Sequence, residues 1–345
     1  MTKTLTTLES PFTGGRVFEV ETTEEQEFRK EKFLVHTRYY VCEDTGEEFT
    51  GNGQDALWTN ELYGQWRVKH GVPFPEEIKA TRMRYGMNYV QITKIMGFGA
   101  NQWKSYEDGC VPSESNGKMM RAVEQKQTML MMLEASRSAF DENEFNKLQM
   151  QVKAAEEKNV DDEITALFYG ATGGLSLMNG YGARDPERVM VMVRWLVKRQ
   201  DGITPTKLNK LMFYSDFHHY RKTGRSISGL QYRAIQYGPV PEHYDTIYDN
   251  VKGLEKRIEI HHEKECSELH VVQYENPLTS SGQAPDENEN CLSEIEIQTL
   301  TEVMERYGKL TTTELIALSH EEEGWKKHQE DKSFIPYDEA FSLKD

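Results

Sequence analysis

The distribution of apolar positions changes along the chain from strand-like to helix-like. Two runs near the N-terminus, residues 16–20 and 33–41, are typical of β-strands, and the second (FLVHTRYYV) is rich in β-branched and aromatic side chains. Turn-forming residues flank them at Thr13-Gly14-Gly15 and Asp44-Thr45-Gly46. This pattern predicts a small β domain over residues 1–65.

Beyond Pro75 the apolar spacing becomes helical. Asn88 is placed to cap a helix, with Gln91 as the N3 residue that reaches back to the cap. One face of that helix is apolar and contains Ile92, Ile95 and Met96. Gly97 ends the helix, so a second helix is expected to begin at Ala100. The pattern predicts two short helices joined by a tight turn, within a helical domain over residues 72–150.

The C-terminal half is also predicted to be mainly helical, after a connector over residues 151–185. Thr204-Pro205 has the N-cap and N1 pattern of a helix start, and Gly224 is expected to end that helix. Residues 257–262 and 269–274 resemble the two strands of a hairpin. Capping boxes at Ser293…Glu296 and Thr311…Glu314 predict two later helices. The expected fold is multidomain and mainly α, with a small N-terminal β domain and a small β insert in an α-rich domain over residues 186–345.

Charge is distributed unevenly in this chain. The 345 residues include 41 Lys and Arg against 57 Asp and Glu, for a net charge of −16. Residues 78–106 carry no acidic side chain and five basic ones, namely Lys79, Arg82, Arg84, Lys94 and Lys104. Subtracting those five charges leaves −21 for the remainder of the chain. General affinity for nucleic acid is therefore not expected, and any contact with DNA should be local to the basic window.

Other compositional features narrow the class of protein. No run approaches the roughly 18 apolar residues of a membrane span, and the start MTKTLTTLESPFTGG has no apolar signal core. We therefore expect a cytoplasmic protein with no membrane partner. The four cysteines are scattered, with no CxxC pair, which indicates neither a disulfide framework nor an intact zinc site. They are Cys42, Cys110, Cys266 and Cys291.

Residues 82–112 resemble a helix-turn-helix of the Cro and phage-repressor type. The resemblance rests on Gly86, Ile92, Ile95, the turn Met96-Gly97-Phe98-Gly99, Trp103, Tyr106, Glu107, Gly109 and Pro112. One position departs from the family, because Tyr89 stands where a glutamine usually contacts the DNA backbone. The resemblance implies a DNA-binding domain that represses the chain's own operon, as a homodimer on a palindromic operator.

The expected second helix supplies the candidate DNA contacts. With Trp103 and Tyr106 packed beneath it, the polar side chains between them should project outward. Amide side chains at the start of a recognition helix suit bidentate contacts to base edges, and basic side chains suit phosphate. The predicted DNA-binding residues are Asn101, Gln102, Lys104, Ser105, Arg82 and Lys94.

The N-terminal β region is similar to that of MqsA-type antitoxins, which place a zinc-binding β domain with two CxxC pairs before a helix-turn-helix. The corresponding positions here read Ser10-Pro11-Phe12-Thr13 and Cys42-Glu43-Asp44-Thr45. Three of the four thiolates would be replaced by hydroxyl side chains, which are poor zinc ligands. We therefore expect no bound metal in this region.

The C-terminal half resembles the Panacea (SocA-like antitoxin) domain. The resemblance rests on the helix LNKLMFYSDFHHY, the segment RAIQYGPV at residues 233–240, and Leu318-Ser319-His320…Trp325-Lys326. It implies an antitoxin that binds and neutralises a co-encoded protein toxin. Aromatic side chains are candidate anchors for the toxin, although they could instead form the domain core. These are Tyr214, Phe217, Tyr220, Tyr237, Tyr244, Tyr248 and Trp325.

Motifs for catalysis are weak in this sequence. The pairs His218-His219 and His261-His262 lack the i, i+4 spacing of helical zinc ligands, and His320 has Gly324 where a second ligand would stand. The segment GATGG lacks the residues that complete a phosphate loop. We therefore expect a non-enzyme with no cofactor. Two alternatives remain open: a phage-type transcriptional regulator with a partner-sensing C-terminal domain, and an adaptor that delivers a partner to a protease.

Overall fold

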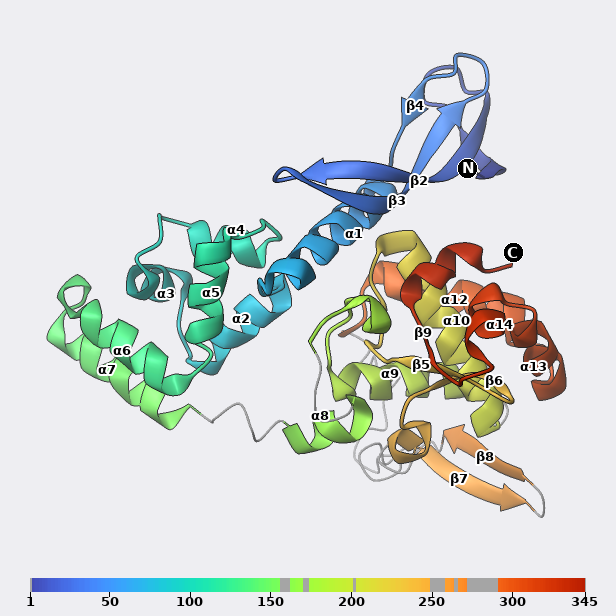
Figure 1. Ribbon diagram of the computed structural model, residues 1–345. Helices are drawn as coiled ribbons and strands as arrows, with labels where there is room; N and C mark the ends of the chain where they lie inside the picture. Colours follow the sequence, from blue (N-terminus) through green and yellow to red (C-terminus); the bar gives the residue numbers. More distant parts are fainter. Residues whose placement is uncertain are drawn as a thin grey trace, which may run out of the picture. The chain divides into compact units, whose positions relative to one another are not determined.

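The computed structural model describes residues 2–155, 162–169, 174–200, 203–248, 258–263, 266–271 and 291–344. The chain divides into two compact units (Figure 1). The first unit contains residues 1–27, 34–61 and 164–345, and the second contains residues 28–33 and 62–163. The N-terminal sheet and the C-terminal helices thus belong to one compact unit. The domain boundaries inferred from the sequence stay predictions.

A four-stranded antiparallel sheet occupies the N-terminal region (Figure 1). Its strands lie in the order β1 (Thr2–Glu9), β2 (Arg16–Phe28), β3 (Glu31–Cys42) and β4 (Glu48–Phe49), and the long helix α1 (Asn52–His70) follows them. Both strands expected from the sequence are confirmed, but each is longer than its apolar run. A strand paired to its neighbours tolerates polar residues on its exposed face, so hydrophobicity underestimates its length.

The second unit packs several short helices around one hydrophobic core. They are α2 (Pro75–Arg84), α3 (Tyr89–Met96), α4 (Gln102–Glu107), α5 (Glu114–Ala122), α6 (Lys126–Ala135), the 3₁₀ turn η1 (Arg137–Ala139) and α7 (Glu142–Ala154). The capping box between Asn88 and Gln91 is confirmed, and Trp103 is fully buried. Helix α4 begins two residues after the expected Ala100. Asn101 has a left-handed backbone with φ of 63°, and a right-handed helix cannot start before it.

The C-terminal part of the first unit is built around helix α10 (Pro205–Thr223), which is buried along nearly its whole length. Helices α8 (Asp162–Tyr169) and α9 (Pro186–Val197) precede it, with the 3₁₀ turn η2 (Leu177–Asn179) between them. Helices α12 (Glu294–Tyr307), α13 (Thr312–His320) and α14 (Glu323–His328) and the 3₁₀ turn η4 (Tyr337–Ser342) follow later in the chain. Burial on nearly every face of α10, polar residues included, identifies it as the central helix of this domain.

Two small sheets accompany these helices. One has the order β6-β5-β9, formed by β5 (Tyr232–Ile235), β6 (Gly238–Pro241) and β9 (Phe334–Ile335). The other is the expected hairpin, β7 (Ile258–Glu263) with β8 (Cys266–Val271). Helix caps at Thr204, Ser293 and Thr311 are confirmed, as is the end of α10 at Gly224. The acidic run SSGQAPDENEN at residues 280–290, which the sequence predicts to be a solvated loop, lies outside the described residues. Among those described, no helix is long and apolar enough to cross a membrane.

Candidate functional site

The six residues predicted to contact DNA do not share one environment. Asn101, Lys94 and Lys104 are exposed, and Gln102 and Ser105 are partly buried. The Lys104 ammonium lies 2.7 Å from the Asp108 carboxylate one helical turn away. Such an exposed pair is weak, so Lys104 can exchange this partner for a phosphate. Lys94 donates to the Ala139 carbonyl over 3.2 Å, and it is equally accessible.

Gln102 and Ser105 are held by hydrogen bonds within the turn between α3 and α4. The Gln102 side chain accepts from the Gly99 amide over 3.0 Å and donates to the Tyr106 hydroxyl over 2.6 Å. The Ser105 hydroxyl donates to the Gln102 carbonyl over 2.8 Å. These bonds fix the turn. Asn101, by contrast, is exposed and its side chain makes no capping bond, so it is the amide best placed to meet a base edge.

Arg82 is buried, and its guanidinium forms a two-point ion pair with Glu107 at 2.7 and 2.9 Å. Glu107 also accepts from the Trp103 indole over 2.7 Å, and Arg82 donates to the Met87 carbonyl. The hydrogen bond with Glu107 raises the pKa of Arg82. This cluster joins α2 to α4, so Arg82 positions the second helix, and its ion pair argues against a direct phosphate contact.

Two turns of the N-terminal sheet have matching geometry. In each, the first residue (Ser10 or Cys42) donates its amide to the carbonyl five residues on and accepts from the glycine four residues on. The Thr13 hydroxyl lies 3.5 Å from the Cys42 sulfur. Hydrogen bonds with Ser10, Thr45 and Thr13 lower the pKa of the Cys42 thiol to about 6. The four positions that correspond to the zinc ligands of MqsA-type antitoxins thus lie close together; they are Ser10, Thr13, Cys42 and Thr45. Within the described residues, no group of three or more metal-ligating side chains could hold a metal ion.

The aromatic side chains predicted to anchor a toxin are mostly in the core. Five of them are buried, namely Tyr214, Phe217, Tyr220, Tyr248 and Trp325. Tyr214 stacks on Tyr307 with ring centroids 4.2 Å apart. Tyr244 is partly exposed, and only Tyr237 of the seven is largely exposed, at 58%. Burial removes five of the candidates from the surface, and it leaves Tyr237 as the most accessible.

Tyr237 lies in the two-residue turn between β5 and β6, and this turn is held firmly from beneath. The buried Lys210 ammonium donates to the Pro239 carbonyl over 2.8 Å, and the Trp325 indole donates to the Ile235 carbonyl over 2.9 Å. Gly238 has a φ of 91°, and a β-carbon there would lie 2.3 Å from the Ser319 hydroxyl. The turn therefore presents Tyr237 on a rigid support. Burial lowers the pKa of Lys210 to about 7.

Asp216 organises the centre of the C-terminal domain and was not singled out from the sequence. Its buried carboxylate accepts hydrogen bonds from the amides of Ile227 and Ser228, each 2.8 Å long, and from the Tyr232 hydroxyl, 2.6 Å long. The Ser228 hydroxyl is a further donor. Burial raises the pKa of Asp216, while these hydrogen bonds oppose the shift. Its position eight residues after Leu208, on the same stripe of α10, was the available signal.

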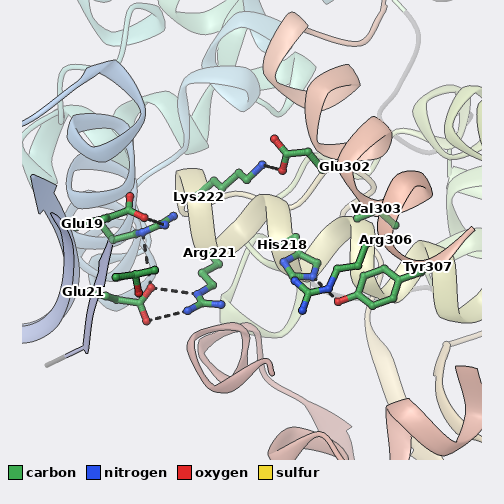
Figure 2. Close-up of a pocket in the computed structure, with 11 residues that line it drawn as sticks. Glu19, Glu21, His218, Arg221, Lys222, Glu302, Val303, Arg306 and Tyr307 are labelled. Carbon is green, nitrogen blue, oxygen red and sulfur yellow. Dashed lines mark hydrogen bonds and ion pairs between the residues drawn. The ribbon is translucent and has the colours of Figure 1, made fainter. Parts of the chain in front are cut away.

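A cleft of about 210 Å³ lies where strands β2 and β3 meet helices α10 and α12. Figure 2 shows Glu21 facing Arg221 and Lys222 facing Glu302. The Arg221 Nε lies 3.1 Å from the Glu21 Oε2. Arg38 of β3 pairs with Glu19 at 2.6 Å. Nearby, buried Glu61 accepts from the Tyr220 hydroxyl over 2.8 Å. These opposite charges neutralise one another. The residues of the cleft therefore hold the sheet against the helices, and we do not assign a ligand to it.

Comparison with known proteins bears on the C-terminal part of the chain. Residues 208–326 match the family model described as antitoxin SocA-like, Panacea domain. The match supports a Panacea domain at the C-terminus. The matched residues include most of α10, the β5–β6 turn, and helices α12 and α13. No curated protein and no solved structure matches the chain. The resemblance of the N-terminal region to MqsA-type antitoxins stays a prediction.

Proposed function

We propose that this chain is the antitoxin of a toxin–antitoxin system. Its Panacea domain binds and neutralises a co-encoded protein toxin, and its α3–α4 region represses its own operon. The match of residues 208–326 to the SocA-like antitoxin family carries the proposal. Neutralisation in this scheme is by occupancy of the toxin surface, without catalysis. The chain outside residues 78–106 has a net charge of −21, which favours a basic toxin.

The decisive test uses the small reading frame adjacent to this chain's own gene and read in the same direction. Expressed alone, its product should stop growth, and co-expression of this chain should restore growth. The two proteins should co-purify. A neighbouring product that is harmless to the cell, or toxic and not rescued, would contradict the antitoxin proposal.

Tyr237 is the proposed centre of the toxin contact. A rigidly supported aromatic side chain loses little conformational entropy on binding, so it suits an interface hot spot. Changing Tyr237 to alanine is expected to weaken toxin binding by about 2 kcal/mol, or roughly thirtyfold in Kd. Titration calorimetry with the purified toxin measures this. Ile295→Ala is the matched control, because it removes another exposed apolar side chain of the same domain that is not a candidate anchor, and it should change Kd less than about threefold.

The α3–α4 region is the proposed DNA-binding element, in a homodimer on a palindromic operator. Its support is the basic window, the capped helix α3 with the short helix α4 after it, and the exposed amide of Asn101 at the start of α4. Because the rest of the chain is acidic, the contact should be confined to this face and should weaken steeply with salt.

Changing Asn101, Gln102 and Lys104 together to alanine is expected to weaken operator binding by about 2 to 4 kcal/mol. The variant loses two amide side chains and one phosphate contact. Gel shifts on the chain's own promoter measure the effect. Lys147→Ala, which removes an exposed lysine of α7, serves as the control for total charge. If the triple variant bound the operator as the natural chain does, the assignment of α4 to the DNA interface would be wrong.

A further inference from the structure

A second and larger groove lies on the N-terminal sheet, and the proposed function does not use it. It has a volume of about 720 Å³ and is lined by strands β2, β3 and β4 and the start of α1. Tyr39, Phe49 and Trp58 supply aromatic surface, and Glu24, Glu48 and Asp55 supply carboxylates. We call it the sheet groove. Its contributors all belong to the first compact unit.

The sheet groove carries uncompensated negative charge. Glu24, Glu48 and Asp55 are exposed, and among the described residues none of the three pairs with a basic side chain. Arg38 is the basic residue of the lining, and it is already paired with Glu19. The negative charge of these carboxylates acts inside the groove. The pKa of Tyr39 is raised, first by burial and second by the charges of Glu48 and Glu24. A cationic ligand is therefore favoured and a nucleic acid is repelled.

The aromatic side chains of the groove are held in place by neighbouring rings, and one polar group in the groove has no hydrogen-bond partner among the described residues. Phe49 is held by Tyr40 and by Phe12, with ring centroids 5.3 and 5.6 Å away. Thr37 also lines the groove, and its buried hydroxyl oxygen has no hydrogen-bond partner in the described structure. Buried hydroxyls are normally satisfied, so this one is available to a bound group.

We propose that the sheet groove binds a cationic peptide segment of a partner protein. Lysine or arginine side chains of that segment lie over the rings of Tyr39 and Trp58 and pair with Glu24, Glu48 and Asp55. Cations are attracted to aromatic faces, and the attraction grows when nearby carboxylates share the charge. The peptide backbone hydrogen-bonds to the Thr37 hydroxyl. This proposal does not depend on the antitoxin proposal, since it concerns a separate surface and is tested without a toxin.

The test uses the full chain and two blocked peptides, one of six lysines and one of six glutamates. Titration calorimetry at roughly 0.1 M salt should show saturable binding of the lysine peptide and none of the glutamate peptide. The groove variant Glu24→Gln, Glu48→Gln, Asp55→Asn should weaken binding at least about tenfold. Trp58→Ala should weaken it about fivefold by removing a cation–π contact.

A charge-matched control separates the groove from general electrostatics. The variant Glu294→Gln, Glu305→Gln, Glu330→Gln removes the same number of exposed carboxylates from α12 and from the turn after α14, and it should bind the lysine peptide as the natural chain does. Circular dichroism confirms that every variant is folded. Equal weakening by the groove and control variants, or failure of the natural chain to bind the lysine peptide, would overturn the proposal.

Discussion

Replacing Asp216 with alanine is expected to destabilise the first unit by about 3 to 5 kcal/mol. The carboxylate is fully buried and satisfies two backbone amides and the hydroxyls of Ser228 and Tyr232. Alanine would leave these donors without acceptors in the domain interior. Urea denaturation followed by circular dichroism measures the loss, and the variant should also lose the neutralising activity proposed above because its Panacea domain is unstable.

Two companion variants make this result specific. Asp216→Asn keeps one acceptor oxygen for the two amides, so it should lose less stability than the alanine variant. Asp245→Ala removes an exposed carboxylate of the same domain and should change the free energy of unfolding by less than about 0.5 kcal/mol. An Asp216→Ala chain that unfolds at the natural urea midpoint would show that the described hydrogen bonds contribute nothing to stability.

Acidification is expected to destabilise the first unit through His219. This side chain is 4% exposed, and its Nδ1 lies 3.3 Å from the Thr299 hydroxyl. Burial lowers its pKa to about 3, and the charges of Lys222 and Arg188 add to the shift. Between pH 3 and 6.5 the His219 imidazole is therefore neutral in the folded chain and protonated in the unfolded chain. Stability from this group is fully present above pH 6.5, and about 3 kcal/mol is lost by pH 4.

The measurement compares unfolding free energies at pH 7 and pH 4.5 in the natural chain and in His219→Gln. Other buried groups titrate in this range, and the raised pKa of Asp216 has the opposite effect on the pH slope. The difference between the two chains isolates His219, because glutamine binds no proton in this pH range. The natural chain should lose about 2 kcal/mol more than the variant. Parallel pH profiles would show that His219 is not the group responsible.

Local elements of this protein were predictable from the sequence because their signals act over a few residues. A side chain that caps a helix does so three positions away, so Asn88, Thr204, Ser293 and Thr311 could be identified directly. The exception at the start of α4 has a local cause as well. Left-handed backbone at Asn101 delays the helix, and asparagine adopts that conformation more readily than most residues.

The candidate sites were less predictable, because partners distant in sequence decide them. Arg82 belongs to the basic window, yet Glu107, which is 25 positions away, pairs with it and buries it. No pattern within the window shows this. The sheet groove was equally hidden, since Glu24, Glu48 and Asp55 become neighbours only when the strands pair and α1 packs beside them.

By itself, the sequence predicted strands β2 and β3, the β7–β8 hairpin, the capped helices, the local basic window in an acidic chain, and the resemblance to the Panacea domain. Tertiary structure alone decided which side chains remain at the surface. Helix α10 is buried on nearly every face, so its periodicity cannot say which of its aromatic side chains, such as Tyr214, are withdrawn from the surface. It also decided that the N-terminal sheet joins the C-terminal helices, through contacts such as Glu21 of β2 with Arg221 of α10, 200 residues apart. Burial and long-range pairing depend on how whole elements pack, and short-range sequence signals do not encode that packing.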